Sequence, residues 1–119
     1  MFDHIGLHVR NLEAARRFYT AALAPFGHVP DDSGTGFGPA GAPSLWLYEA
    51  SGKDVARTHI AFRASTRDAV ERFYRAGLAA GGSDNGKAGL RADYSPTYFA
   101  AFLRDPDGNN VEAVCLSGG

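Results

Sequence analysis

Two of the four histidines stand at equivalent positions of an internal repeat, and these two offer the clearest chemistry in the chain. His4 precedes Ile5 and His59 precedes Ile60, an offset of 55 residues from position 4 to position 59. A fixed offset that keeps producing identities indicates repeated units. We therefore interpret the chain as a single domain, residues 1–119, built from one module of about residues 1–50 and a second of about residues 58–119. Further identities at this offset pair Ala14 with Ala69, Arg17 with Arg72, Phe18 with Phe73, Tyr19 with Tyr74, Ala21 with Ala76, Leu23 with Leu78 and Gly27 with Gly82.

A third candidate ligand is Glu112, which lies between the apolar residues Val111 and Ala113. A carboxylate in such a stretch is costly to bury unless it is paired or binds a metal ion. Two histidines and one carboxylate form the facial triad of non-haem iron enzymes, and the same set can hold Mn, Ni, Co or Zn. An isolated histidine at a strand start is more often simply a polar residue. The repetition nevertheless favours a divalent metal site of His4, His59 and Glu112, with Glu112 as the candidate catalytic residue.

The elements that must position these residues follow from hydrophobic periodicity. Residues 5–9 alternate apolar and polar types, which is typical of a half-buried strand. Asn11 then caps a helix over residues 12–23, and Gly27 ends it. The second module repeats this order, and each module is thus a strand, a helix and two or three further strands, an α+β arrangement. We expect further strands at 44–49, 59–64, 98–104 and 110–116, a helix at 67–80 capped by Ser65 or Thr66, Gly-rich loops at 31–43 and 81–89, and a hairpin turn at 105–109.

Composition excludes several classes of function. The chain has 12 basic and 13 acidic side chains and a formal charge of −1, so we expect no nucleic-acid partner. The lone Cys115 excludes an intramolecular disulfide and a cysteine zinc cluster. No stretch approaches the roughly 20 apolar residues that span a bilayer, and residues 1–4 do not resemble a leader peptide. We therefore expect a soluble cytoplasmic protein without a membrane partner.

Several motifs together resemble a known superfamily. They are Asp3-His4-Ile5-Gly6-Leu7-His8-Val9, Asn11-Leu12-Glu13, Arg17-Phe18-Tyr19, Thr58-His59-Ile60-Ala61-Phe62 and the segment from Asp105 to Glu112. In this order the chain resembles the vicinal oxygen chelate superfamily, which includes glyoxalase I, bleomycin resistance proteins, extradiol dioxygenases and fosfomycin resistance transferases. The resemblance covers essentially the whole chain. It implies two βαβββ modules whose curved mixed sheets form a cup around a divalent metal, and frequent homodimers, but it identifies the reaction only weakly.

The resemblance carries the first-strand ligand to His4, the second-module histidine to His59 and the last-strand glutamate to Glu112. It departs from the pattern at the fourth ligand of glyoxalase I, because Trp46 stands where a glutamate is expected. Glu49 does not replace it, since three residues along a strand lead to the opposite face. A site with three protein ligands leaves positions for water or substrate. This weakens an assignment to glyoxalase I itself and leaves substrate-chelating chemistries open.

Strand parity, the alternation of side chains between the two faces of a strand, suggests which residues line the cup. The candidates for substrate binding are Trp46, Tyr48, Tyr98 and Phe102, an aromatic lining that suits an apolar or aromatic small molecule with a few oxygen atoms. For Tyr48 and Phe102 a place in the core is an equally good interpretation. His8 shares the face of His4 and could orient it through a hydrogen bond.

Charged and polar residues of the second-module loop, namely Lys87, Arg91 and Tyr94, could meet an anion. A solvated loop is the commoner explanation for such residues.

Two functions remain open on this sequence. The first is a divalent-metal-dependent enzyme, a lyase, an isomerase or a dioxygenase-like protein, in which the ion chelates the oxygens of a small substrate. The second is a metal-free protein that sequesters a small molecule, as bleomycin resistance proteins do, and Trp46 in place of a ligand favours it. The sequence also leaves open whether the site closes within one chain or across two.

Overall fold

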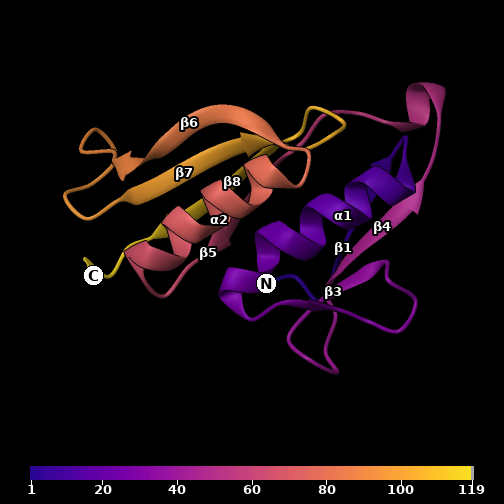
Figure 1. The fold of residues 1–119 in the computed structure, drawn as a ribbon, viewed down its shortest axis with the longest axis horizontal. Helices are drawn as coiled ribbons and strands as arrows, with labels where there is room; N and C mark the ends of the chain where they lie inside the picture. Colours follow the sequence, from indigo (N-terminus) through magenta and orange to yellow (C-terminus); the bar gives the residue numbers. More distant parts are fainter. Residues whose placement is uncertain (119) are drawn as a thin grey trace.

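The computed structural model describes residues 1–118 and has the expected α+β architecture of two modules (Figure 1). Each module contributes one four-stranded sheet, in the strand orders β1-β4-β3-β2 and β5-β8-β7-β6, and the two sheets are not closed into a single cup. No helix within residues 1–118 is long and apolar enough to cross a membrane. The elements are β1 (Ile5–Val9), α1 (Leu12–Leu23), η1 (Ala24–Phe26), β2 (Val29–Pro30), β3 (Gly36–Gly38), β4 (Leu45–Glu49), η2 (Gly52–Asp54), β5 (His59–Arg63), α2 (Arg67–Ala79), β6 (Ser83–Leu90), β7 (Phe99–Arg104) and β8 (Asn110–Cys115).

The main helices begin where the sequence predicts. The side chain of Asn11 accepts a hydrogen bond from the Ala14 amide at 3.0 Å, and Thr66, one of the two expected caps, accepts one from the Ala69 amide at 3.1 Å. These bonds satisfy amide groups that have no partner inside the helix.

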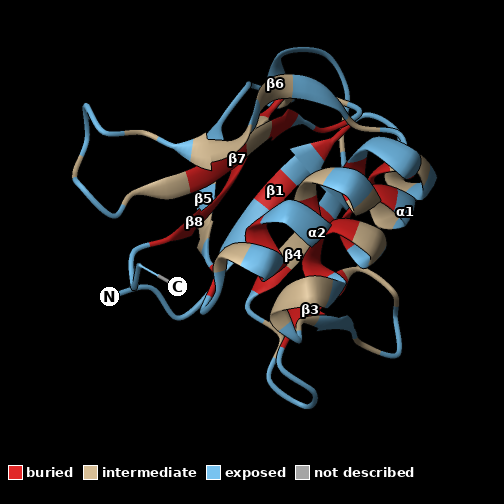
Figure 2. Ribbon diagram, turned by 60° about the vertical axis from the view of Figure 1, so that its left-hand side comes forward, coloured by how far each residue is buried: buried red, intermediate tan, exposed pale blue. Residues whose placement is uncertain are grey.

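Both helices pack against one another, and each covers one face of the sheet of its own module (Figure 1). Buried residues gather where the helices meet the strands (Figure 2). Gly77 of α2 permits the close approach of α2 to β7 and to α1, because a Cβ atom there would lie 2.3 Å from Leu103 and 3.2 Å from Phe18. One core therefore serves both modules, and its largest fully buried side chains are Tyr19, Phe18, Phe37, Phe73, Leu23 and Leu103.

The turn between β7 and β8 links the modules through buried polar groups. Asp105 is 4% exposed and accepts a hydrogen bond from the Tyr19 hydroxyl at 2.6 Å. The amide and side-chain nitrogens of Asn109 also donate to this carboxylate, at 2.9 and 2.8 Å. Asn109 in turn accepts from the Thr58 amide, immediately before β5. The predicted turn is confirmed, and Gly108 adopts the positive φ of 87° that it requires.

The Gly-rich segments are more regular than expected. Most of the predicted loop at residues 81–89 is wrong, because Ser83–Leu90 form β6, and the loop at 31–43 contains β3. The polar, Gly-rich composition of β6 gives no strand signal of its own. Pairing with β7 stabilises this strand, and its register shifts around Gly86.

Candidate functional site

Each sheet has a second face that no helix of its module covers. In β1 and β4, Leu7, Val9 and Leu47 point into the core, whereas His8 and Tyr48 alternate with them on the opposite, exposed face. In the second module, β5 alternates in the same way. The open faces carry predicted site residues, namely Trp46 and Tyr48 in module 1 and His59, Phe102 and Glu112 in module 2. His4 immediately precedes β1, and Tyr98 immediately precedes β7.

The open face of module 2 holds a connected polar cluster. The Nε2 atom of His59 lies 2.8 Å from Oε1 of Glu112, and the Tyr98 hydroxyl donates to Oε2 of the same carboxylate. Three neighbouring elements supply these residues: β5, β8 and the segment leading into β7. Because β5 and β8 are parallel, with Ala61 opposite Glu112, His59 reaches Glu112 diagonally on the same face.

Glu112 is the buried member of this cluster. Its side chain is 3% exposed, against 54% for His59. Such a carboxylate is costly to bury alone, but here each of its oxygens has a partner. The pKa of Tyr98 is raised to about 12 by its desolvation, then by its hydrogen bond to Glu112 and by the negative charge of that carboxylate. Tyr98 therefore remains a neutral hydrogen-bond donor at pH 7.

His4 does not join this cluster within one chain. Its side chain is 61% exposed, and its Nδ1 atom pairs with Asp3 at 2.7 Å. Across residues 1–118, no three His, Cys, Asp or Glu side chains gather closely enough to hold a metal ion. One chain thus brings together two of the three predicted ligands, His59 and Glu112.

Trp46 occupies the position in module 1 that Glu112 occupies in module 2. Trp46 pairs with Gly6, and Glu112 pairs with Ala61; Gly6 and Ala61 are related by the same 55-residue offset as the histidines, so Trp46 and Glu112 face equivalent positions of the two first strands. This register places an indole ring where a fourth carboxylate ligand would stand. Glu49 lies elsewhere, as strand parity predicts, and accepts a hydrogen bond from the Leu12 amide at the start of α1.

The aromatic residues of module 1 lie against glycines. A Cβ atom on Gly36 would lie 2.5 Å from the Trp46 ring, and one on Gly6 would lie 2.8 Å from the Tyr48 ring. Both rings therefore rest close to the sheet. Tyr48 is 49% exposed, so it is a surface residue of the open face rather than part of the core. The ring of His8 lies 5.8 Å from that of Tyr48 and makes no hydrogen bond to His4 within residues 1–118.

Phe102 lies beside the polar cluster of module 2. Phe102 is opposite Glu112 in the β7–β8 ladder, and its ring centroid lies 6.5 Å from that of His59. The sequence identified Tyr98 as a substrate-binding candidate but missed its hydrogen bond to Glu112. Strand parity was the available signal, because Tyr98 is four residues from Phe102 and shares its face.

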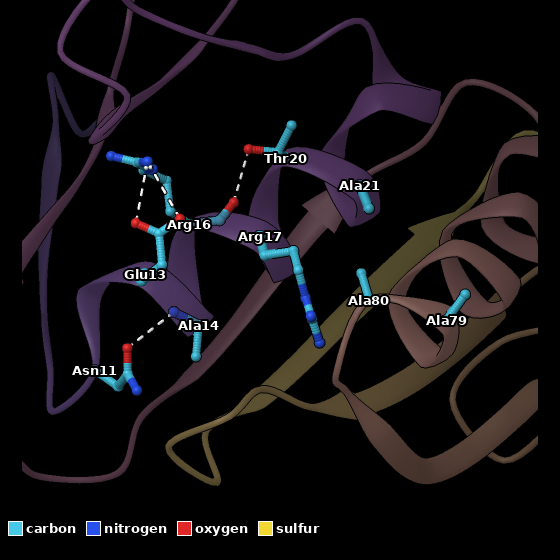
Figure 3. Close-up of a pocket in the computed structure, with 9 residues that line it drawn as sticks. All are labelled: Asn11, Glu13, Ala14, Arg16, Arg17, Thr20, Ala21, Ala79 and Ala80. Atoms are coloured by element: carbon cyan, nitrogen blue, oxygen red, sulfur yellow. Dashed lines mark hydrogen bonds and ion pairs between the residues drawn. The ribbon is translucent and has the colours of Figure 1, made fainter.

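Two hollows of the surface lie away from these residues. The larger, of about 890 Å³, is formed by α1 and the end of α2 and is lined by Asn11, Arg16, Arg17, Thr20 and Ala80 among others (Figure 3). Arg16 is paired there with Glu13 at 3.1 Å. A second hollow, of about 780 Å³, lies beside Phe26 and His28. The pKa of His28 is lowered because burial disfavours its charged form.

Comparisons with known proteins place these observations in context. Residues 1–113 match the family described as the Glyoxalase/Bleomycin resistance protein/Dioxygenase superfamily. A solved glyoxalase/bleomycin resistance protein from Albidiferax ferrireducens T118 is 27% identical, with a TM-score of 0.78 over 97% of this chain and 98% of that one. No curated protein matches the chain at a significant level.

Two more distant structures share the fold. A lactoylglutathione lyase from Agrobacterium tumefaciens is 19% identical, with a TM-score of 0.65 over 97% of this chain and 92% of the other. A glyoxalase/bleomycin resistance protein/dioxygenase family enzyme from Burkholderia phytofirmans PsJN is 16% identical, with a TM-score of 0.70 over 96% and 97% of the two chains. At these identities the likeness concerns the fold alone.

Proposed function

The chain belongs to the Glyoxalase/Bleomycin resistance protein/Dioxygenase superfamily, and from this premise we propose that it is a divalent-metal-dependent enzyme acting on a small, oxygen-chelating substrate. The observation that carries the proposal is the His59–Glu112 pair, with a 2.8 Å contact on an otherwise open sheet face. An imidazole nitrogen and a carboxylate oxygen are ligands that Fe, Mn, Ni, Co and Zn all accept. The reaction would be that of a lyase, an isomerase or a dioxygenase-like enzyme.

The residues of one chain supply only two of the three ligands, so the proposal includes a homodimer. His4 and His59 are both more than half exposed, on sheet faces that residues 1–118 leave uncovered. A second copy could therefore bring its His4 to the His59 and Glu112 of the first. Twofold symmetry would then create two equivalent sites.

The groups around the cluster have distinct proposed roles. A bound divalent ion would act as a Lewis acid on the substrate oxygens. Glu112 would accept a proton from the substrate as the catalytic base, while the neutral Tyr98 hydroxyl holds its second oxygen and orients it. Phe102 would exclude water on one side of the cluster. Trp46 would leave a coordination position free for substrate and would contact the substrate with its ring.

The test is metal binding by calorimetry on chelator-stripped protein, titrated with each of the five ions. We expect wild type to bind one ion per chain with submicromolar affinity, and His4→Ala, His59→Ala and Glu112→Gln each to lose that affinity. His8→Ala is the matched control, because His8 lies on the same face as His4 but is not a proposed ligand. Binding by wild type no tighter than millimolar would refute the metal-dependent function.

A mixing experiment tests the second copy. His4→Ala and His59→Ala protein are mixed in equal amounts, unfolded and refolded together. If the site is shared between copies, half of the dimers are mixed, and each mixed dimer regains one of its two sites, or about one quarter of the wild-type capacity. A site contained within one chain would regain none.

One observation favours a second function, the metal-free binding of an aromatic molecule. Trp46 replaces a ligand and rests on Gly36, which makes the face of module 1 aromatic instead of metal-binding. Binding of a planar aromatic compound that quenches Trp46 fluorescence, and that is unaffected by chelator and by Glu112→Gln, would support this function over the first.

A further inference from the structure

Arg91 folds back over the open face of module 2 immediately after β6. Its Cζ atom lies 5.4 Å from the centroid of the Phe102 ring, and its Nη2 atom donates to the Lys87 carbonyl oxygen at 2.6 Å. A guanidinium in this position is attracted by the π electrons of the ring and loses part of its freedom. Arg91 is partly buried, whereas Lys87 is exposed.

Two glycines of β6 make room for this guanidinium. A Cβ atom on Gly86 would lie 3.3 Å from Nη2 of Arg91, and one on Gly89 would lie 3.3 Å from Nη1. Gly86 also has a φ of 149°, at one of the register shifts between β6 and β7. Side chains at these positions would crowd the guanidinium. The Gly-rich composition of β6 led to its prediction as a loop, and two of its glycines leave space for the Arg91 side chain.

Arg91 lacks the partner that such a guanidinium normally has. None of the ion pairs within residues 1–118 involves Arg91, even though Asp93 is only two residues away. A guanidinium carries five N–H donors, and within residues 1–118 the Lys87 carbonyl oxygen is the single hydrogen-bond acceptor of the Arg91 side chain. The remaining donors are available to a ligand with oxygen atoms.

The guanidinium is also close to the His59–Glu112 cluster. The Phe102 ring neighbours both, with its centroid 5.4 Å from Cζ of Arg91 and 6.5 Å from the centroid of the His59 ring. A small molecule lying along Phe102 would therefore be within reach of both the polar cluster and a cation. A planar guanidinium matches the geometry of a carboxylate better than that of a neutral oxygen group.

We propose that Arg91 binds a carboxylate group of the substrate, so that this face takes a small organic carboxylate in preference to a neutral molecule. The inference rests on the proposed function in that it takes the His59–Glu112 face as the substrate site. It does not depend on the metal. Arg91 would set the charge of the accepted substrate and its orientation over Phe102.

The test compares benzoate with benzamide, which have the same ring but differ in charge. Each is titrated into chelator-stripped, ¹⁵N-labelled full chain while the Arg91 Nε–Hε signal of wild type and, in every variant, the backbone amide signals of β7 are followed by NMR. We expect benzoate to shift this signal with a Kd below about 10 mM and to bind more tightly than benzamide. Arg91→Gln should weaken benzoate binding about tenfold or more and leave benzamide unchanged. Arg75→Gln, on the exposed side of α2, is the matched control and should change neither.

Several results would overturn the assignment. These are equal affinity for benzoate and benzamide, a carboxylate preference that survives Arg91→Gln, or no benzoate binding below about 10 mM. Phenylphosphonate is included as a third probe. If it binds and benzoate does not, the site prefers a phosphonate or phosphate and the carboxylate assignment is wrong.

Metal titration of Arg91→Gln separates this inference from the proposed function. Unchanged metal affinity together with a lost benzoate preference supports both. If wild type binds no metal but benzoate binding still depends on Arg91, only the metal-dependent function is refuted. If metal binds and Arg91→Gln does not change the affinity for benzoate, only the carboxylate inference is refuted.

Discussion

Tyr19 and Tyr74 hold the same position in the two modules, and each donates its hydroxyl hydrogen to an aspartate. Tyr19 donates to Asp105 at 2.6 Å, and Tyr74 donates to Asp84 at 2.9 Å. The first pair is buried and joins the two modules, whereas the second is exposed and lies within module 2. We predict that Tyr19→Phe destabilises the fold much more than Tyr74→Phe does.

The magnitude follows from burial. A hydrogen bond to a charged group contributes about 1.5–3 kcal/mol. Asn109 continues to donate to Asp105 after the change, so we expect Tyr19→Phe to lower the free energy of unfolding by about 2 kcal/mol. With an entropy of unfolding of about 0.25 kcal/mol/K for a chain of this length, Tm falls by about 8 °C. Tyr74→Phe removes a bond that water can replace, so we expect it to leave the free energy of unfolding nearly unchanged.

The assay is urea denaturation of both variants and wild type at pH 7, followed by circular dichroism, with thermal melts in parallel. The slope of the free energy against urea should be the same for all three, because the surface exposed on unfolding does not change. Equal losses for the two variants would refute the argument from burial. A loss of stability in Tyr74→Phe alone would show that the exposed hydrogen bond contributes more than the buried one.

Two further predictions concern the open faces. Gly36→Ala introduces a Cβ atom 2.5 Å from the Trp46 ring, so the ring must move. We expect the free energy of unfolding to fall by about 1–3 kcal/mol and the fluorescence of this single tryptophan to shift to the red. Unchanged emission would contradict the contact. Tyr98, with its pKa raised to about 12, binds its proton more tightly in the folded state, so its contribution to stability is present below pH 10 and is lost as pH rises towards 12. Absorbance at 295 nm should show a tyrosine ionisation near pH 12 that is lost in Tyr98→Phe and moves to lower pH in Glu112→Gln. If Glu112→Gln leaves this ionisation unchanged, Glu112 does not raise the pKa of Tyr98.

The local elements were predictable because local patterns determine them. The alternation in residues 5–9 predicted β1, and Asn11 predicted the start of α1. β6 was not predictable, because Gly86 and Gly89 carry no strand preference and the strand depends on pairing with β7. Composition indicates the secondary structure that a segment prefers in isolation, whereas an edge strand can form because it pairs with the neighbouring strand.

The site was predictable only within a module. The repeated histidine and the apolar neighbours of Glu112 predicted His59 and Glu112 as ligands, and the structure brings these two residues together. The separation of His4 was not predictable, because the arrangement of the modules depends on helix packing through Gly77 and on the buried Asp105 network. Neither feature has a signal in the repeat, so the sequence left both a one-chain and a two-chain site open.

The two modules differ in one cross-strand pair on their open faces, and the difference is explained by the volumes and hydrogen bonds of the side chains. In module 1 the cross-strand pair is Gly36 with Trp46, and in module 2 it is Phe102 with Glu112. Each pair combines one large ring with one smaller residue, so each sheet face accommodates one ring at this point. Glu112 can be buried because His59 and Tyr98 satisfy its oxygens, whereas in module 1 the counterpart of His59, His4, pairs with Asp3 instead. One face is therefore polar and the other aromatic. A site formed between them would combine a proton-accepting group with a stacking surface, and a symmetric dimer would hold two such sites of one kind.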